Sequence, residues 1–299
     1  MTPHDLARWL DGGPRTLDGA MGSELLRRGV MAAAKLWGVG ALIEAPHAVR
    51  QLHHAYAAAG ADALTAATFR VAPYALRRIG VPHRARELAA LAVRLARDGA
   101  SEAGREALVF ASHTTLEDCY RPDLVPDEPT LAHEHARTAA ALADSGADGL
   151  LLETFNTIRE ARAATEAAAS TGLPVIVCFT CVAGGRLLSG EDAREAAAVV
   201  SRPGVVAVGV NCTTCAALPE ALARVSAGTT LPLVAYANNA FFATDSTFLA
   251  AQPLSPAAYA AQAATWAAAG ARLVGGCCGT NPAYIAAVAS QFRRGRIQS

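Results

Sequence analysis

The chain has 299 residues, of which 52% are hydrophobic and 17% are charged, a balance that supplies a large core and excludes an intrinsically disordered protein. The formal net charge is zero and no run of Lys or Arg is longer than a pair, which argues against nucleic acid as a partner. The sequence shows neither an apolar signal core at its start nor the ~20 consecutive apolar residues of a spanning helix, so we expect a cytoplasmic protein without a membrane partner.

Short apolar, β-branched runs alternate along the chain with longer alanine-rich stretches whose charged residues recur at helical spacing. The expected strands are residues 15–18, 62–68, 107–112, 148–153, 174–179, 205–211, 232–236 and 272–276. Gly60, Gly146 and Gly270 each precede a strand in a related tetrapeptide, as glycines that end a helix do. Eight such units predict an α/β protein, a single (β/α)8 TIM barrel over residues 1–299.

A doubly wound parallel sheet would show the same alternation, but no G-x-G-x-x-G follows the first strand and no G-x-x-x-x-G-K-[ST] occurs in the chain. The Pro-rich segment 121–129 suits a long loop after the third strand, and Ser255-Pro256 suits the start of a helix. These features favour one barrel domain, as a monomer or a homo-oligomer.

The working residues of such barrels lie at the carboxyl ends of the strands. Polar and sulfur-containing residues collect after the predicted strands, and they are Asp18, Gly19, Thr68, Glu153, Asn211, Cys212, Asn238, Cys277 and Cys278. We therefore expect these side chains to converge on one mouth of the barrel.

Cys212, Cys277 and Cys278 form the clearest pattern, because they follow strands that are close neighbours around the barrel and three thiolates suit zinc. Three protein ligands leave a fourth position open, which is typical of a catalytic zinc, and a substrate thiol bound there would lose its proton at neutral pH.

The chain has seven cysteines and we expect no signal peptide, which favours reduced thiols over a disulfide framework. Cys119, Cys178, Cys181 and Cys215 are expected to fill core or loop space, as buried cysteines commonly do. A closed four-cysteine site that recruits Cys215 is the alternative to an open zinc site.

Three motifs, residues 16–22 (TLDGAMG), 209–212 (GVNC) and 275–280 (GGCCGT), resemble those of the homocysteine S-methyltransferase family, and the likeness extends over nearly the whole chain. The resemblance implies a barrel that binds zinc through Cys212, Cys277 and Cys278, with the homocysteine sulfur as the next ligand. It also implies that Asp18 and Glu153 contact the amino group of the substrate.

Each of these polar residues could instead have a simpler, structural role. Asp18 could serve a turn beside Gly19, and Glu153 could pair with an arginine at the rim such as Arg159. Asn211 and Asn238 could bind the substrate carboxylate or satisfy loop backbone groups.

Three further residues near the predicted mouth have less specific patterns. Trp37 could form an aromatic wall for a cationic methyl donor or pack within a loop. Thr68, at the end of the second strand, belongs to the predicted substrate-binding set. Of the eight histidines, His113 is the one expected to approach the mouth.

The barrel accounts for essentially the whole chain, which favours a small diffusible methyl donor. S-Methylmethionine or S-adenosylmethionine fits, because a thiolate can attack a sulfonium methyl in line. Residues 111–119 depart from the Ser-hydrophobic-Gly-Pro pattern that many family members carry at this strand. Two alternatives therefore stay open: a different thiol or donor, or a module that works with a separate corrinoid protein.

Overall fold

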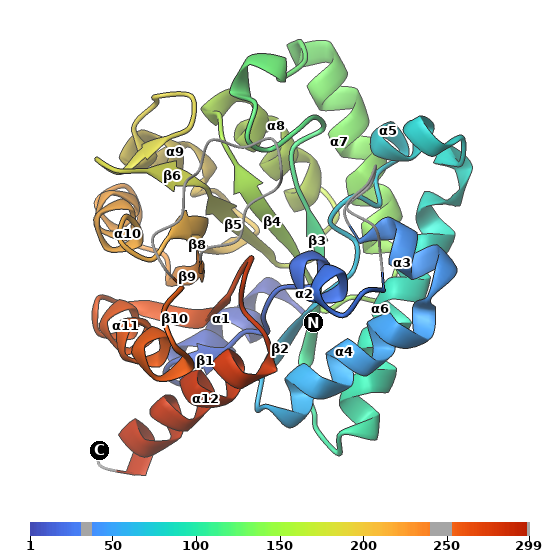
Figure 1. Cartoon of the computed structure of the whole chain (residues 1–299). Helices are drawn as coiled ribbons and strands as arrows, with labels where there is room; N and C mark the ends of the chain where they lie inside the picture. The colour runs from blue at the N-terminus through green and yellow to red at the C-terminus, as the bar shows by residue number, and fades with distance from the viewer. Residues whose placement is uncertain (31–37, 240–252, 298–299) are drawn as a thin grey trace.

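The computed structural model describes residues 1–30, 38–239 and 253–297. Its centre is an eight-stranded parallel sheet with the strand order β1-β10-β9-β8-β5-β4-β3-β2 (Figure 1). The strands are β1 (Arg15–Thr16), β2 (Ala63–Ala66), β3 (Leu108–His113), β4 (Gly149–Phe155), β5 (Val175–Phe179), β8 (Val205–Thr214), β9 (Leu233–Asn238) and β10 (Ala271–Gly276). A parallel bridge between Leu17 and Ala63 joins β1 to β2 and closes the sheet. The predicted (β/α)8 barrel is confirmed, and each expected run overlaps one of its strands.

Helices surround the barrel and cover the outer faces of its strands (Figure 1). The longer ones are α4 (Pro46–Ala58), α6 (Ala85–Glu102), α7 (Glu128–Ala143), α8 (Ile158–Ala169), α9 (Ala193–Val200), α10 (Leu218–Ser226), α11 (Pro256–Ala268) and α12 (Pro282–Ile297). Short ones are α2 (Gly22–Arg27), α3 (Val39–Glu44), α5 (Pro73–Leu76), η1 (Arg77–Ile79), η2 (Pro82–Arg84) and η3 (Pro122–Leu124).

The helix boundaries follow from local chemistry that the sequence shows. Ser255 caps α11 by accepting a hydrogen bond from the Ala258 N–H, as the Ser-Pro pair predicts. Gly60, Gly146 and Gly270 have φ of +101°, +81° and +105°, so each takes the left-handed conformation that ends a helix. The repeated glycine tetrapeptides therefore do mark helix-to-strand junctions.

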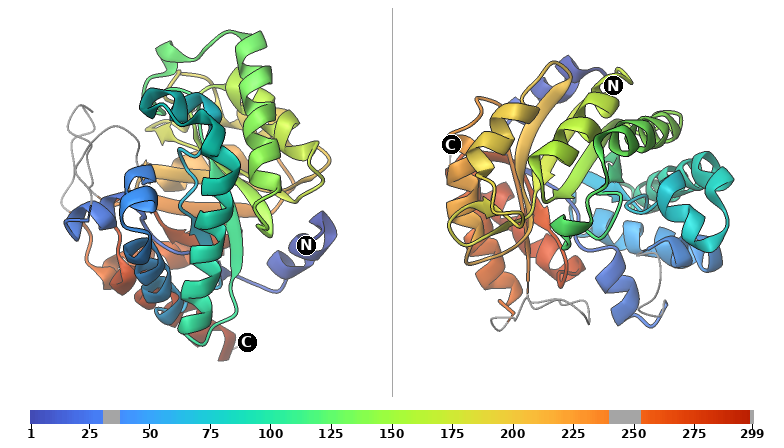
Figure 2. Two further views of the ribbon diagram at one scale, coloured as in Figure 1. Left: turned by 90° about the vertical axis from the view of Figure 1, so that its right-hand side faces the viewer. Right: turned by 90° about the horizontal axis from the view of Figure 1, so that it is seen from above.

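The first helix, α1 (Pro3–Asp11), lies at one end of the barrel (Figure 2). Leu6 and Leu10 are fully buried there, in one cluster with barrel residues such as Phe110 and Leu151. This helix closes the barrel floor, a role that the sequence patterns did not predict.

Two irregularities lie at the opposite, carboxyl ends of the strands. The β4–β5 register shifts between Leu152 and Phe155, and the β8–β9 register shifts between Asn211 and Thr214. A small hairpin of β6 (Cys181–Val182) and β7 (Arg186–Leu187), absent from the expected elements, follows β5. Within the described ranges, no helix has the length and apolar character to cross a membrane.

Candidate metal centre and substrate site

The thiols of Cys212, Cys277 and Cys278 converge at the carboxyl end of the barrel. Their sulfur atoms all lie within 4.8 Å of one another, and the Sγ atoms of Cys212 and Cys278 are 3.6 Å apart. Within the described part of the chain, this is the one group of three or more Cys, His, Asp or Glu residues that could hold a metal ion. The spacing and the soft donor set fit a thiolate metal ion such as zinc.

Backbone hydrogen bonds hold the neighbouring residues Cys277 and Cys278 in place. The N–H of Cys277 donates to the carbonyl of Ala237, at 3.0 Å, and the carbonyl of Cys278 accepts from the N–H of Asn239, at 2.8 Å. Thr280 donates its hydroxyl proton to the Cys277 carbonyl, at 2.7 Å, and a Cβ at Gly276 would lie 2.3 Å from this hydroxyl oxygen. Glycine at 276 is therefore required by close packing against the turn.

Cys212 is the thiol most readily ionised in this cluster. Hydrogen bonds from Cys277 and Cys278 hold the pKa of Cys212 well below its usual range, and the same bonds raise the pKa values of the two donors. The Tyr120 hydroxyl lies 3.0 Å from Cys212 Sγ. Tyr120 was not predicted as a site residue, because it lies in a long loop without a periodic pattern.

Asp18 and Glu153 are two carboxylates buried near the cluster, only 2% and 7% exposed. Asp18 Oδ2 accepts the Thr65 N–H at 2.9 Å, and Glu153 Oε2 accepts the Tyr236 hydroxyl at 3.1 Å. Burial raises the pKa of Asp18 to about 8 and that of Glu153 to about 7, and the charge of Glu153 adds to the rise at Asp18.

Neither carboxylate has an ion-pair partner among the residues that the structure describes. Arg159, the alternative partner of Glu153, instead donates to the carbonyls of Val125 and Pro126, at 2.6 and 2.8 Å. The two buried acids thus lack a compensating charge, which a cationic ligand would supply.

The remaining predicted residues lie around this mouth in different environments. A Cβ at Gly19 would lie 2.8 Å from the Tyr56 ring, so close packing requires glycine there. Thr68 is buried and donates its hydroxyl to the carbonyl of Ser112, at 2.8 Å, which ties β2 to β3. Asn238 places its side-chain nitrogen 3.7 Å from Cys212 Sγ. Trp37 lies outside the described residues.

Asn211 has a fully buried side chain directed at Thr154. Its Oδ1 accepts from the Thr154 N–H at 2.7 Å, and its Nδ2 donates to the Thr154 hydroxyl at 2.8 Å. Both ends of the carboxamide therefore contact the residue that follows Glu153.

The other four cysteines do not join the cluster. Cys119, Cys178 and Cys181 are buried, and Cys215 is partly buried with its sulfur 3.7 Å from the Asn238 carbonyl. Burial raises the pKa of Cys119 to about 12 and that of Cys215 to about 11. They fill space as predicted, and the closed four-cysteine alternative is not formed.

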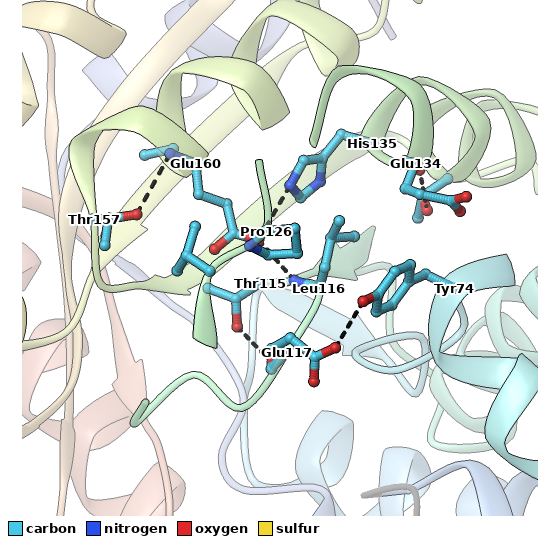
Figure 3. Close-up of polar contacts among 12 residues, drawn as sticks. Tyr74, Thr115, Leu116, Glu117, Pro126, Glu134, His135, Thr157 and Glu160 are labelled. Carbon is cyan, nitrogen blue, oxygen red and sulfur yellow. Dashed lines mark hydrogen bonds and ion pairs between the residues drawn. The ribbon is translucent and has the colours of Figure 1, made fainter. Parts of the chain in front are cut away.

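The loop between β3 and α7 brings Tyr120 to the cluster. Buried polar residues hold the part of this loop around Leu116 in place (Figure 3). Glu160 Oε1 accepts the Leu116 N–H at 2.8 Å and lies 3.3 Å from His135 Nε2. His135 Nδ1 in turn lies 2.8 Å from His113 Nε2. The His113 side chain thus points to α7, although its strand position suggested the mouth.

The same loop is held from its other side by residues of the β2–α5 connection and of α5. The guanidinium of Arg70 donates to the carbonyls of Thr115 and Glu117, at 2.8 and 2.7 Å. The Tyr74 hydroxyl donates to Glu117 Oε1, at 2.7 Å (Figure 3). Contacts with Glu160 on one side, and with Arg70 and Tyr74 on the other, therefore fix the conformation of the loop that carries Tyr120.

The fold and the cluster together define a (β/α)8-barrel enzyme with three thiols that could hold a metal ion and two buried carboxylates at its mouth. The model of one family, Homocysteine S-methyltransferase, matches residues 15–292. The chain belongs to this family.

Relatives in this family align with the chain over nearly their whole lengths. Homocysteine S-methyltransferase of Escherichia coli (strain K12) is 32% identical, covering 91% of this chain and 93% of its own. Homocysteine S-methyltransferase 4 of Zea mays is 29% identical, covering 94% and 90%. The crystal structure of the homocysteine methyltransferase MmuM from Escherichia coli, in a metallated form, superposes with a TM-score of 0.81 at 32% identity, covering 96% of this chain and 99% of that one.

Proposed function

We propose that this enzyme transfers a methyl group from a small sulfonium donor, S-methylmethionine or S-adenosylmethionine, to the thiol of homocysteine and so forms methionine. The observation that carries the proposal is the presence of two recognition elements at one barrel mouth. A cluster of three thiols suits a metal ion that binds sulfur, and two buried carboxylates suit an ammonium group.

Cys212, Cys277 and Cys278 would hold Zn²⁺ as three thiolates. The fit rests on the convergence of the three sulfur atoms and on the lowered pKa of Cys212, because the thiolate is the form that binds a metal ion. Bound zinc would supply Lewis acidity that lowers the pKa of a neighbouring substrate thiol. The metallated crystal form of MmuM supports a metal in this family.

Asp18 and Glu153 would bind the amino group of homocysteine. Their raised pKa values mean that each carboxylate lacks a compensating charge in its buried position. An ammonium placed between them would favour the ionised forms and form charge-assisted hydrogen bonds. Asn238 and the packing at Gly19 and Thr68 would complete the wall of the amino-acid pocket.

The methyl transfer itself needs the substrate thiolate and an electrophilic methyl carbon. The homocysteine sulfur forms a bond to the methyl carbon while the donor carbon–sulfur bond breaks, and the bonding pair stays on the donor sulfur as a neutral thioether. The thiol proton leaves to solvent before the transfer. The product is a neutral thioether as well, a poorer partner for a thiolate metal site than the substrate, which favours release.

The test is metal content by mass spectrometry on reduced protein, followed by methyl transfer from S-methylmethionine to homocysteine with the purified chain alone. We expect about one zinc per chain, with metal and transfer both lost in Cys277→Ser and both kept in the matched control Cys215→Ser. Metal without transfer would point to another thiol or donor, or to a separate corrinoid protein. Absence of metal in the reduced wild type would refute the zinc site.

We also place this activity in the cytoplasm, with small molecules as its partners. All seven cysteines are free in the structure, and thiolate ligands need a reducing compartment to stay free. Locating the tagged chain in fractionated cells would test this assignment.

A further inference from the structure

Two residues at the mouth have backbone conformations that side chains rarely adopt. Within the described ranges, Thr154 and Cys212 are the non-glycine residues with positive φ, at +65° and +47°. Each lies where a strand register shifts at the carboxyl end of the barrel, Thr154 directly after Glu153 in β4 and Cys212 directly after Asn211 in β8. Such conformations persist only where the surroundings hold them, and they concentrate at functional sites.

Asn211 connects the two strained positions. It precedes Cys212 in the chain, and its carboxamide makes both hydrogen bonds to Thr154, through the backbone N–H at 2.7 Å and the hydroxyl at 2.8 Å. Strands β4 and β8 are not neighbours in the sheet, because β5 lies between them. The side chain therefore reaches past β5 to the other strand, and it is fully buried there.

Thr154 is also the residue directly after Glu153, whose carboxylate accepts the Tyr236 hydroxyl in the barrel interior. A change in the Thr154 backbone would rotate the adjoining peptide and redirect the Glu153 side chain. Asn211 is thus bonded covalently to a metal ligand and by two hydrogen bonds to the neighbour of a substrate ligand.

We propose that Asn211 is a positioning residue that sets the Cys212 thiol and the Glu153 carboxylate relative to each other. This inference rests on the proposed function, in which those two groups hold the sulfur end and the amino end of one substrate. Catalysis of this kind depends on placing reacting groups accurately. By linking Cys212 to Glu153, Asn211 would set the distance between the two groups to suit the length of the amino-acid thiol.

The experiment is a double-mutant cycle of Asn211→Ala and Thr154→Gly. Glycine takes positive φ without steric cost, so it removes the strain that Asn211 holds in place. We expect Asn211→Ala to raise the homocysteine Kd of the zinc-loaded enzyme about tenfold in the wild-type background and by clearly less in the Thr154→Gly background. The milder Thr154→Val, which removes only the hydroxyl acceptor, should act in the same direction if Asn211→Ala fails to fold.

A second readout reports on the metal ligand independently of turnover. Cobalt is loaded in place of zinc, and the thiolate-to-cobalt absorption bands are compared across the cycle. Asn211→Ala and Thr154→Val should shift these bands, because either change disturbs the conformation at Cys212. Glu153→Gln should raise the homocysteine Kd and leave the bands unchanged. Thr165→Val, which removes a buried hydroxyl bound to Ala161 in α8, is the control for general loss of stability.

Two results would overturn the proposal: equal effects of Asn211→Ala on Kd in both backgrounds, or cobalt bands that do not respond to Asn211→Ala or Thr154→Val. If the wild type binds cobalt but no homocysteine, the proposed substrate is wrong, and the bands across the cycle still decide whether Asn211 and Thr154 act together on Cys212.

Discussion

Asp18→Asn is expected to stabilise the zinc-loaded, substrate-free protein strongly at pH 8 and only weakly at pH 5, while it weakens homocysteine binding. The Asp18 carboxylate is buried, and it accepts one backbone N–H, from Thr65 at 2.9 Å. Asparagine keeps an oxygen for that bond and cannot ionise. The substitution therefore removes the charge and keeps this hydrogen bond.

The magnitude follows from the pKa of Asp18, which burial raises from 3.8 to about 8. Because the folded state holds this proton more tightly than the unfolded state, the free energy of unfolding falls as the pH rises between these two values. At ~1.4 kcal/mol per pKa unit, the raised pKa of Asp18 lowers the free energy of unfolding by on the order of 5 kcal/mol at pH 8 and on the order of 1–2 kcal/mol at pH 5. The neighbouring Glu153, Tyr56 and Tyr236 stay in place in both proteins.

Urea unfolding at the two pH values measures the difference, with an unchanged m value as the sign that only stability has changed. Calorimetry at pH 8 measures homocysteine binding, for which a lost charge-assisted hydrogen bond predicts a rise in Kd of roughly 10- to 150-fold. Asp98→Asn, at an exposed position in α6, is the matched control without a pH-dependent gain. Equal stabilisation at pH 5 and pH 8, or unaltered homocysteine binding, would refute the reasoning.

Three further outcomes are expected. Cys278→Ser should lose zinc, measured by mass spectrometry, while its circular dichroism stays that of the wild type; retention of a full metal equivalent would contradict the three-thiol site. Gly209→Ala should cost ~1–3 kcal/mol or more in urea unfolding, because its Cβ would lie 2.0 Å from the Val234 carbonyl oxygen; Gly40→Ala, which meets nothing within 4 Å, is the control. Leu10→Ala should cost ~2–5 kcal/mol without altering kcat, since it empties the closed end of the barrel; a matching loss of kcat would place the site elsewhere.

The barrel could be predicted because each repeated unit contains local signals that mark where its helix ends and its strand begins. Gly60, Gly146 and Gly270 end helices in the left-handed conformation, and the apolar runs after them lie in the strands. Parallel strands that are covered on both faces appear in the sequence as short apolar runs. Such runs can be recognised without knowing which strands pair with each other. Because the working residues of such barrels lie at the carboxyl ends of the strands, the sequence also predicts a site at Cys212, Cys277 and Cys278. The structure brings these three residues together.

The rest of the site depends on contacts between distant segments, and no local pattern encodes them. Tyr120 reaches Cys212 because Glu160, 40 residues further along the chain, binds the loop that carries it. The hydrogen bonds between Asn211 and Thr154 join residues that are 57 positions apart and lie on strands separated by β5. Helix α1 closes the barrel floor through Leu6 and Leu10, whose spacing alone predicts an amphipathic helix and no particular partner.

The mouth combines features that are each unfavourable for the free protein. It holds two carboxylates whose burial opposes their charge, two non-glycine residues in left-handed conformations, and three thiols in mutual contact. The barrel interior and α1 supply apolar packing at the other end, which makes that local cost tolerable. Because a metal ion would relieve the thiols and an ammonium would relieve the acids, the same features that destabilise the free protein would become binding energy for its ligands, which is the physical reason for keeping them.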